Sequence, residues 1–94
     1  MQVVRWNLED PTGNPIRPED PMPEMPDIPA ATVVVLEGRA PIWRYGRAFH
    51  AVHGSAAAVA TYDPRLGGAV IVASHLPGTA EGDLITLEEN NAVL

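Results

Sequence analysis

The sequence predicts an α+β protein with a mostly antiparallel sheet, one clear helix and a proline-rich crossover. Three observations lead to this prediction: apolar β-branched runs of strand length, a single segment with helical periodicity, and seven prolines between residues 10 and 30. Runs rich in Val, Ile and Thr are typical of strands, and prolines at this density preclude a long helix. The 94 residues are expected to form a single domain, residues 1–94.

The first half of the chain contains two predicted strands. Alternation in QVVRWNLE predicts a strand over 2–9, and the continuous apolar run ATVVVLE predicts a buried strand over 31–37. The crossover between them, residues 10–30, allows at most one helical turn, around PEDPM at 18–22.

Residues 41–53 are predicted to form the helix. Pro41 suits the first helical turn, where a missing N–H group costs nothing, and Gly54 suits the C-cap. A single buried face is expected from the three- and four-residue spacing of Ile42, Tyr45, Phe49 and Val52.

A hairpin and a short strand are predicted to complete the sheet. SAAAVATYD at 55–63 and GAVIVASH at 68–75 are joined by DPRLGG, where Asp63 and Pro64 open a type I turn and Gly67 takes the left-handed position. LPGTAEGD at 76–83 is expected to be a loop, and LITLEE at 84–89 a last strand.

Composition narrows the class of protein. The absence of cysteine excludes disulfides and thiolate metal sites. Because neither a signal-peptide pattern nor an apolar run of about 20 residues is present, a cytoplasmic protein without a membrane partner is expected.

The net charge of −6 argues against a DNA partner, but residues 38–75 carry four arginines and one acid. Arginine without lysine suits bidentate phosphate contacts, although the codon bias of a GC-rich genome explains it equally well.

All three histidines lie in the same part of the chain as one isolated aspartate: His50, His53 and His75, with Asp63. Imidazole and carboxylate groups form ligand sets for manganese, iron or zinc, or an acid–base pair. The alternative, which the residues alone favour, is that the histidines are structural or exposed and that Asp63 only opens a turn. Asp63 and His75 are expected at opposite ends of the hairpin, so one chain does not easily bring them together.

GRAP at 38–41 is a second candidate site. Gly38 permits close backbone approach, and the start of the helix presents free N–H groups to an anion, flanked by Arg39 and Arg44. The alternative is a plain strand-to-helix turn.

Four short motifs occur in a recognisable order: GRAPIW, HAVH, YDPRLG and SH, followed more weakly by EGDLI. In these motifs the chain resembles the manganese-dependent ring nucleases of type III CRISPR systems, small CRISPR-associated proteins first described as RNA deadenylases. The resemblance implies a ferredoxin-like fold and a homodimer that associates further around its substrate. It also implies cleavage of cyclic tetra-adenylate to linear di-adenylate, which would switch off antiviral signalling.

The resemblance also implies roles for individual residues. Catalysis is expected from His53 and Asp63, and binding of manganese from His50, His53 and His75. Arg65 is the implied contact to a phosphate oxygen. Gly38, Arg39 and Arg44, from the GRAP site, and Trp43 are the other predicted substrate-binding residues; Trp43 or Tyr45 could stack on adenine, although core packing is the expected role of Tyr45. The chain departs from the family pattern where His53 is followed by Gly54, because the family can carry two adjacent histidines there.

Two other functions remain compatible with the sequence. One is a non-catalytic module that binds cyclic oligoadenylate or single-stranded RNA. The other is a structural subunit whose histidines are incidental. The acidic total and the absence of lysine weaken general RNA binding and favour a small ligand held between subunits.

Overall fold

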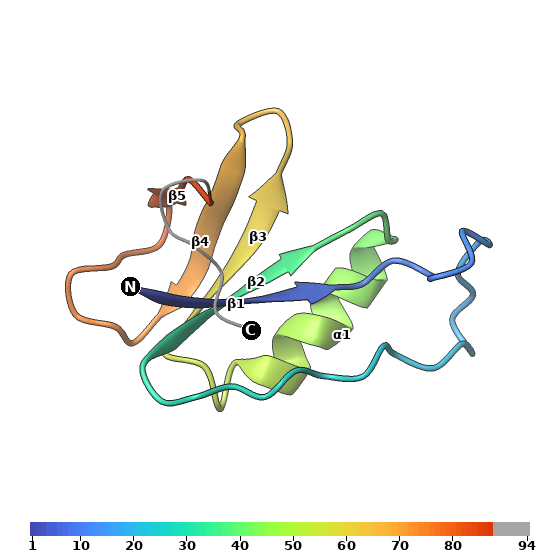
Figure 1. Cartoon of the computed structure of the whole chain (residues 1–94), viewed down its shortest axis with the longest axis horizontal. Helices are drawn as coiled ribbons and strands as arrows, with labels where there is room; N and C mark the ends of the chain where they lie inside the picture. Colours follow the sequence, from blue (N-terminus) through green and yellow to red (C-terminus); the bar gives the residue numbers. More distant parts are fainter. Residues whose placement is uncertain (88–94) are drawn as a thin grey trace.

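The computed structural model describes residues 1–87, which form a five-stranded sheet with one helix against one face (Figure 1). The elements are β1 (Gln2–Asn7), β2 (Thr32–Glu37), α1 (Ile42–Val52), β3 (Ala58–Asp63), β4 (Gly68–Ser74) and β5 (Leu84–Ile85). The strands lie side by side in chain order, β1-β2-β3-β4-β5. The predicted α+β class, with one helix in the described residues, is confirmed.

The sheet is divided between parallel and antiparallel pairing. β1 and β3 both pair with β2 in parallel, whereas β4 pairs antiparallel with β3 and with β5. The expected antiparallel pairing therefore holds for β3, β4 and β5, and the first three strands run parallel. The succession also departs from the ferredoxin-like β-α-β-β-α-β pattern, because the first crossover, residues 8–31, carries no helix.

Both crossovers lie on the same face of the sheet. Crossovers between parallel strands are right-handed, and these two advance in the same direction across the sheet. The proline-rich segment extends beyond the carboxyl ends of β1 and β2 and returns beside α1 (Figure 1). Its side chains Met22 and Ile28 pack into the same apolar cluster as Ala48 and Val52 of α1.

Two apolar layers enclose the sheet. The layer under α1 consists of Trp6, Leu8, Val34, Leu36, Ala48, Val52, Ala56 and Val59. The layer on the opposite face consists of Val3, Val33, Val35, Ala58, Ala60, Ala69, Ile71, Ile85 and Leu87. Residues 32–36 of β2 alternate between the two layers and are all buried. Since full burial of such a side chain contributes about 1.5–3 kcal/mol, β2 is the centre of the core.

The helix differs in detail from its prediction. Pro41 is the N-cap and not the first helical residue, and the C-cap is His53, so the predicted cap, Gly54, lies one position beyond the observed one. The predicted buried face is wrong at Ile42, which is 87% exposed, and it omits Arg44, which is 4% exposed. The buried row of α1 is residues 44, 48 and 52: Ala48 and Val52 pack with the sheet, and Arg44 lies among residues of the crossover.

The turns and the last strand can also be compared with their predictions. Gly67 has a φ of 68°, the left-handed conformation expected in the hairpin. PEDPM forms only a turn, closed by a hydrogen bond from Asp20 N to Arg17 O at 3.0 Å. The strand expected at 84–89 is limited to Leu84–Ile85 in the described part, and residues 88 and 89 lie outside it. Within residues 1–87, no helix has the length and apolar character needed to cross a membrane.

Substitution of Gly38 tests the close contact between the end of β2 and Asn7 at the end of β1. Its φ is +103°, and a Cβ atom there would collide with Asn7 Oδ1, which accepts a hydrogen bond from Glu9 N at 2.9 Å. We predict that Gly38→Ala lowers the free energy of unfolding by about 1–3 kcal/mol, through backbone strain and the displaced Asn7 side chain. Urea denaturation measures the change.

The matched control is Gly46→Ala, in the interior of α1, where a Cβ atom meets no other atom within 4 Å. That substitution should stabilise the protein by about 0.5–1 kcal/mol, because alanine loses less backbone entropy in a helix. Equal unfolding free energies for the two variants would contradict the role assigned to Gly38.

Candidate functional site

The predicted catalytic residues lie at two opposite ends of the β3–β4 hairpin. Asp63 pairs with Gly68 at the turn, and Ala58 pairs with Ser74 at the other end. His75 follows directly, with its N–H donating to Ala57 O at 2.8 Å. A strand of this length spans roughly 20 Å. The structure therefore agrees with the expectation that one chain holds Asp63 and His75 far apart.

The end that carries the three histidines is called the histidine end. His50 and His53 are neighbours at the end of α1, with ring centroids 5.9 Å apart, and Phe49 stacks on His53 at 5.3 Å. The turn after His53 leads to Ala57, whose carbonyl accepts the hydrogen bond from His75. All three histidines are exposed. A role for these histidines in the core is therefore excluded, whereas the alternative that they are merely exposed side chains stays open.

A manganese ion is not accommodated by the histidine end of one chain. Within residues 1–87, no three side chains of His, Asp or Glu form a group that could hold a metal ion. His50 and His53 supply two neighbouring imidazoles, whereas manganese favours carboxylate, carbonyl and water ligands. A complete site would need further ligands from outside the described part of the chain, such as a second copy.

The other end carries Asp63 and Arg65 and is called the aspartate end. Arg65 Nη2 and Nε donate to the two carboxylate oxygens of Asp63 at 2.9 and 3.2 Å, and the backbone N–H of Arg65 donates at 2.9 Å. The side-chain hydrogen bond from Arg65, followed by the backbone one, lowers the pKa of Asp63 below its usual 3.8. Asp63 is thus a carboxylate at neutral pH, and its pairing with Arg65 makes it a weak base.

Arg65 is placed to exchange partners. Its side chain is 87% exposed, whereas that of Asp63 is 23% exposed. An exposed ion pair of this kind contributes little to stability, so the cost of opening it is small. A guanidinium binds phosphate in the same bidentate geometry as carboxylate. An arriving phosphodiester can therefore replace Asp63 on Arg65.

At the start of α1, Gly38 is explained by packing. Its left-handed conformation lets β2 close against Asn7 at the end of β1, and Gly38 O accepts a hydrogen bond from the Tyr45 hydroxyl at 2.6 Å. Burial, followed by the charges of Glu37 and Glu9, raises the pKa of Tyr45. Nothing in this geometry requires a ligand at Gly38, and its predicted contact with substrate stays a prediction.

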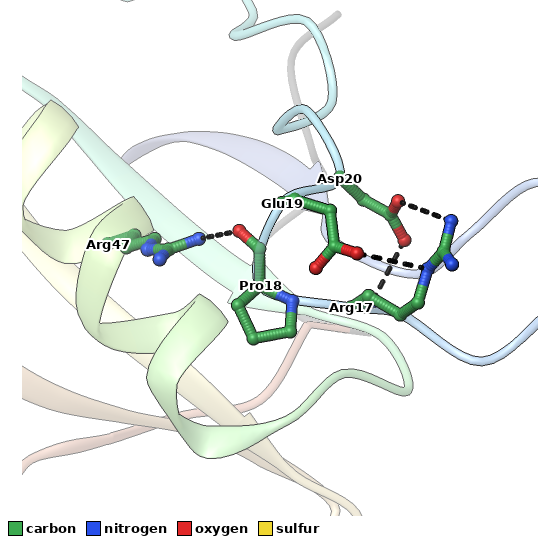
Figure 2. Close-up of polar contacts among 5 residues, drawn as sticks. All are labelled: Arg17, Pro18, Glu19, Asp20 and Arg47. Carbon is green, nitrogen blue, oxygen red and sulfur yellow. Dashed lines mark hydrogen bonds and ion pairs between the residues drawn. The ribbon is translucent and has the colours of Figure 1, made fainter.

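Trp43 already has a partner on one side. The Arg47 guanidinium lies 5.0 Å from the centroid of its ring, at the spacing of four residues that brings helical side chains together. Arg47 Nη1 also donates to Pro18 O at 2.9 Å, which ties α1 to the crossover (Figure 2). A base could stack on Trp43 only on its other face or after Arg47 moves.

Arg39 and Arg44 line two adjoining pockets at the carboxyl ends of β1 and β2. Arg44 lines the larger one, about 770 Å³, which we call the crossover pocket. Its other walls come from the proline-rich segment: Asp10, Pro11, Asn14, Pro15, Arg17, Asp20, Pro21, Met22, Pro23 and Glu24. Arg39 lines a pocket of about 270 Å³, which shares Asp10, Asn14 and Pro15 with the first.

Both arginines were predicted beside the start of α1, but the crossover was not predicted to form a wall of their pockets. The signal that could have found it is the position of Met22 and Ile28. These are apolar side chains in a proline-rich segment that needs an apolar surface to cover.

Comparison with known proteins finds similarity over most of the chain. The family model described as CRISPR-associated protein (Cas_csx3) matches residues 10–86. An uncharacterized protein of Aquifex aeolicus (strain VF5) is 49% identical over 59 residues, which cover 63% of this chain and 52% of the relative. The chain thus spans about half the length of that relative. The residues matched by the family model include both ends of the hairpin, all of the crossover pocket and all of the smaller pocket except Glu9.

The pairing of Asp63 with Arg65 is testable by titration. We predict that Arg65→Gln raises the pKa of the Asp63 carboxyl back toward 3.8, because its largest cause of lowering is removed. Carboxyl-detected NMR as a function of pH measures this value. Arg17→Gln, which removes a guanidinium paired with Glu19 and Asp20, should leave Asp63 unchanged. An unaltered Asp63 titration in Arg65→Gln would contradict the pairing.

Proposed function

The chain belongs to the family of CRISPR-associated proteins described as Cas_csx3, and we propose that it is a metal-dependent ring nuclease. In this proposal it cleaves cyclic tetra-adenylate to linear di-adenylate and so switches off type III CRISPR antiviral signalling. The observation that carries the proposal is the exposed Arg65, paired with Asp63 in the turn of YDPRLG. An exposed guanidinium held by a displaceable carboxylate is suited to capture a phosphodiester.

The chemistry we propose uses the ribose 2′-hydroxyl as nucleophile. Its oxygen forms a bond to phosphorus, its proton passes to a base, and the bond from phosphorus to the 5′ oxygen breaks as that oxygen takes up a proton. Arg65 would hold the non-bridging oxygens as negative charge develops. His53 suits the role of base better than Asp63, since the lowered pKa of Asp63 makes its carboxylate a weak proton acceptor.

The separation of the two ends supports a site shared between copies. Asp63 and Arg65 lie at one end of the hairpin and His75 at the other. We propose that the protein is a homodimer whose copies associate further around the ring, so that the aspartate end of one meets the histidine end of another. A symmetric assembly matches the repeated units of a cyclic tetranucleotide.

Manganese remains part of the proposal as the group that would neutralise developing charge. His50 and His53, with His75 or another group from a second copy, are the residues proposed to hold it. The described residues of one chain alone offer the ion an incomplete set of ligands.

A binding module without turnover is the second candidate function. The observation that favours it is the same separation, since a single chain assembles no complete catalytic group within residues 1–87. Such a module would sequester cyclic oligoadenylate or, less readily for an acidic chain, single-stranded RNA. Turnover distinguishes the two functions, because a sequestering protein returns its ligand intact.

The activity itself is the first prediction. Incubation with cyclic tetra-adenylate and manganese should yield linear di-adenylate, identified by mass spectrometry. His53→Ala and Asp63→Ala should each lower the rate by about 10²-fold or more, as loss of an acid–base or ligand group does. Arg65→Ala should also weaken substrate binding.

Glu81→Gln, at an exposed acid outside both ends, is the matched control and should keep the wild-type rate. Circular dichroism verifies that each variant is folded. If no product forms at high enzyme and metal concentration, the ring-nuclease proposal fails.

The shared site makes a separate prediction. A mixture of Asp63→Ala and His75→Ala chains should recover part of the activity that each lacks, because a mixed pair of copies can contain one intact site. Specific activity should also rise with protein concentration until the assembly saturates. A self-contained site would instead give no recovery on mixing and a constant specific activity down to nanomolar protein.

A further inference from the structure

The crossover pocket contains a buried cation, Arg44, that makes no side-chain hydrogen bond or ion pair in the described residues. Its charge does act on Asp10 of the same pocket, whose pKa is lowered mainly by hydrogen bonds from Thr12 and in smaller part by Arg44. Arg44 is 4% exposed, and its Nε is buried without a hydrogen-bond acceptor. No hydrogen bond or ion pair joins its guanidinium to another side chain among residues 1–87. Burial of a guanidinium in this state is unfavourable, because the donors lose water without gaining an acceptor. Arg44 lines the pocket, so a ligand there can offer an acceptor to the part of the guanidinium that faces it.

The acids in the same walls are mostly engaged. Asp10 accepts hydrogen bonds from the backbone N–H and the hydroxyl of Thr12, at 2.7 and 2.6 Å. Asp20 accepts from the backbone N–H of Arg17 at 2.8 Å and pairs with its guanidinium (Figure 2). Glu24 alone among these acids makes no hydrogen bond or ion pair within the described residues. Arg44 and Glu24 are thus the two charged side chains of the pocket without a hydrogen bond or ion pair in the described residues, and the neutral side chain of Asn14 in the same walls also makes none.

Because Arg44 can donate and Glu24 can accept hydrogen bonds in the same pocket, we infer that the crossover pocket binds an adenine base and that these two side chains recognise it. A ring nitrogen of adenine accepts from Arg44, and the exocyclic amino group donates to Glu24. A simple anion is disfavoured, because three carboxylates line the same pocket. Four prolines and Met22 supply apolar walls for the faces of the ring, and about 770 Å³ is within the range of small-ligand pockets.

The adjoining pocket extends this assignment from a base to a nucleotide. It shares three lining residues with the crossover pocket and carries Arg39 on its wall. Arg39 is exposed and is positioned to meet a phosphate attached to the bound nucleoside. The inference deepens the proposed function, on which its substrate class rests. It adds base recognition by residues of the proline-rich crossover, which belong to neither the histidine end nor the aspartate end.

Binding without cleavage tests the inference. Adenosine and adenosine monophosphate are titrated into the full chain by calorimetry, alongside purine riboside, which lacks the amino group, and inorganic phosphate. We expect adenosine to bind, the monophosphate to bind more tightly, and purine riboside to bind at least about tenfold more weakly, because Glu24 then stays unpaired. Inorganic phosphate should not compete with adenosine.

Two variants with matched controls locate the site. Glu24→Ala should weaken adenosine binding by about tenfold, whereas Asp27→Ala, an exposed acid of the same segment outside the pocket, should have no effect. Arg44→Met should abolish binding and yet raise the melting temperature or leave it unchanged, because an apolar side chain replaces an unpaired buried charge. A structural role for Arg44 would instead lower it.

The outcomes separate this inference from the proposed function. Wild-type adenosine affinity in Arg44→Met, equal affinities for adenosine and purine riboside, or displacement of adenosine by phosphate would each overturn it. Adenosine binding that depends on Arg44 and Glu24 sustains the inference even if cyclic tetra-adenylate is never cleaved. Cleavage of cyclic tetra-adenylate without such adenosine binding would support the proposed nuclease activity and contradict the inference that the crossover pocket binds adenine.

Discussion

The burial of β2 is the constraint on which the rest of the structure depends. Its residues 32–36 are buried between two apolar layers, and both of its edges pair with parallel neighbours. Parallel neighbours require two crossovers, and their common handedness sends both to the same face. The crossovers must therefore begin side by side at the carboxyl ends of β1 and β2. Ligands of open α/β sheets also bind at carboxyl ends of strands, and here the two arginine-lined pockets occupy that position.

The change from parallel to antiparallel pairing at β3 determines what one chain can do chemically. A strand that returns by a tight turn places its two ends a full strand length from each other, so Asp63 and His75 are separated by the ladder that holds them rigid. The same rigidity fixes His53 near the end of β4, because the turn after α1 feeds directly into β3. Flexibility cannot close a gap of about 20 Å in a packed sheet. A second copy can close it without any change of fold.

The sequence predicted the elements better than it predicted their surroundings. The hairpin, the buried strand over 31–37 and the cap-to-cap extent of the helix follow from local signals such as Asp63, Gly67 and β-branched runs. The buried face of α1 did not, because periodicity treats Ile42 as apolar and Arg44 as polar. Tertiary packing reversed both, leaving Ile42 exposed and covering Arg44 with the crossover. Pairing within the candidate site could not be predicted either, since whether Arg65 binds Asp63 or a ligand depends on side-chain geometry.

The prolines give the crossover a role that a helix could not fill. A helix packed at this position would bury its own apolar stripe and satisfy its own backbone, leaving a continuous surface. An extended proline-rich segment has few conformations to lose, so it can form walls at low entropic cost. Arg47 fixes it to α1 through Pro18 (Figure 2), and Met22 and Ile28 anchor it to the core. Between these anchors the segment covers Arg44 but offers no hydrogen-bond acceptor to its Nε. In the base-binding role proposed for the crossover pocket, the ligand would supply the acceptor that the segment does not, as a pre-organised site requires.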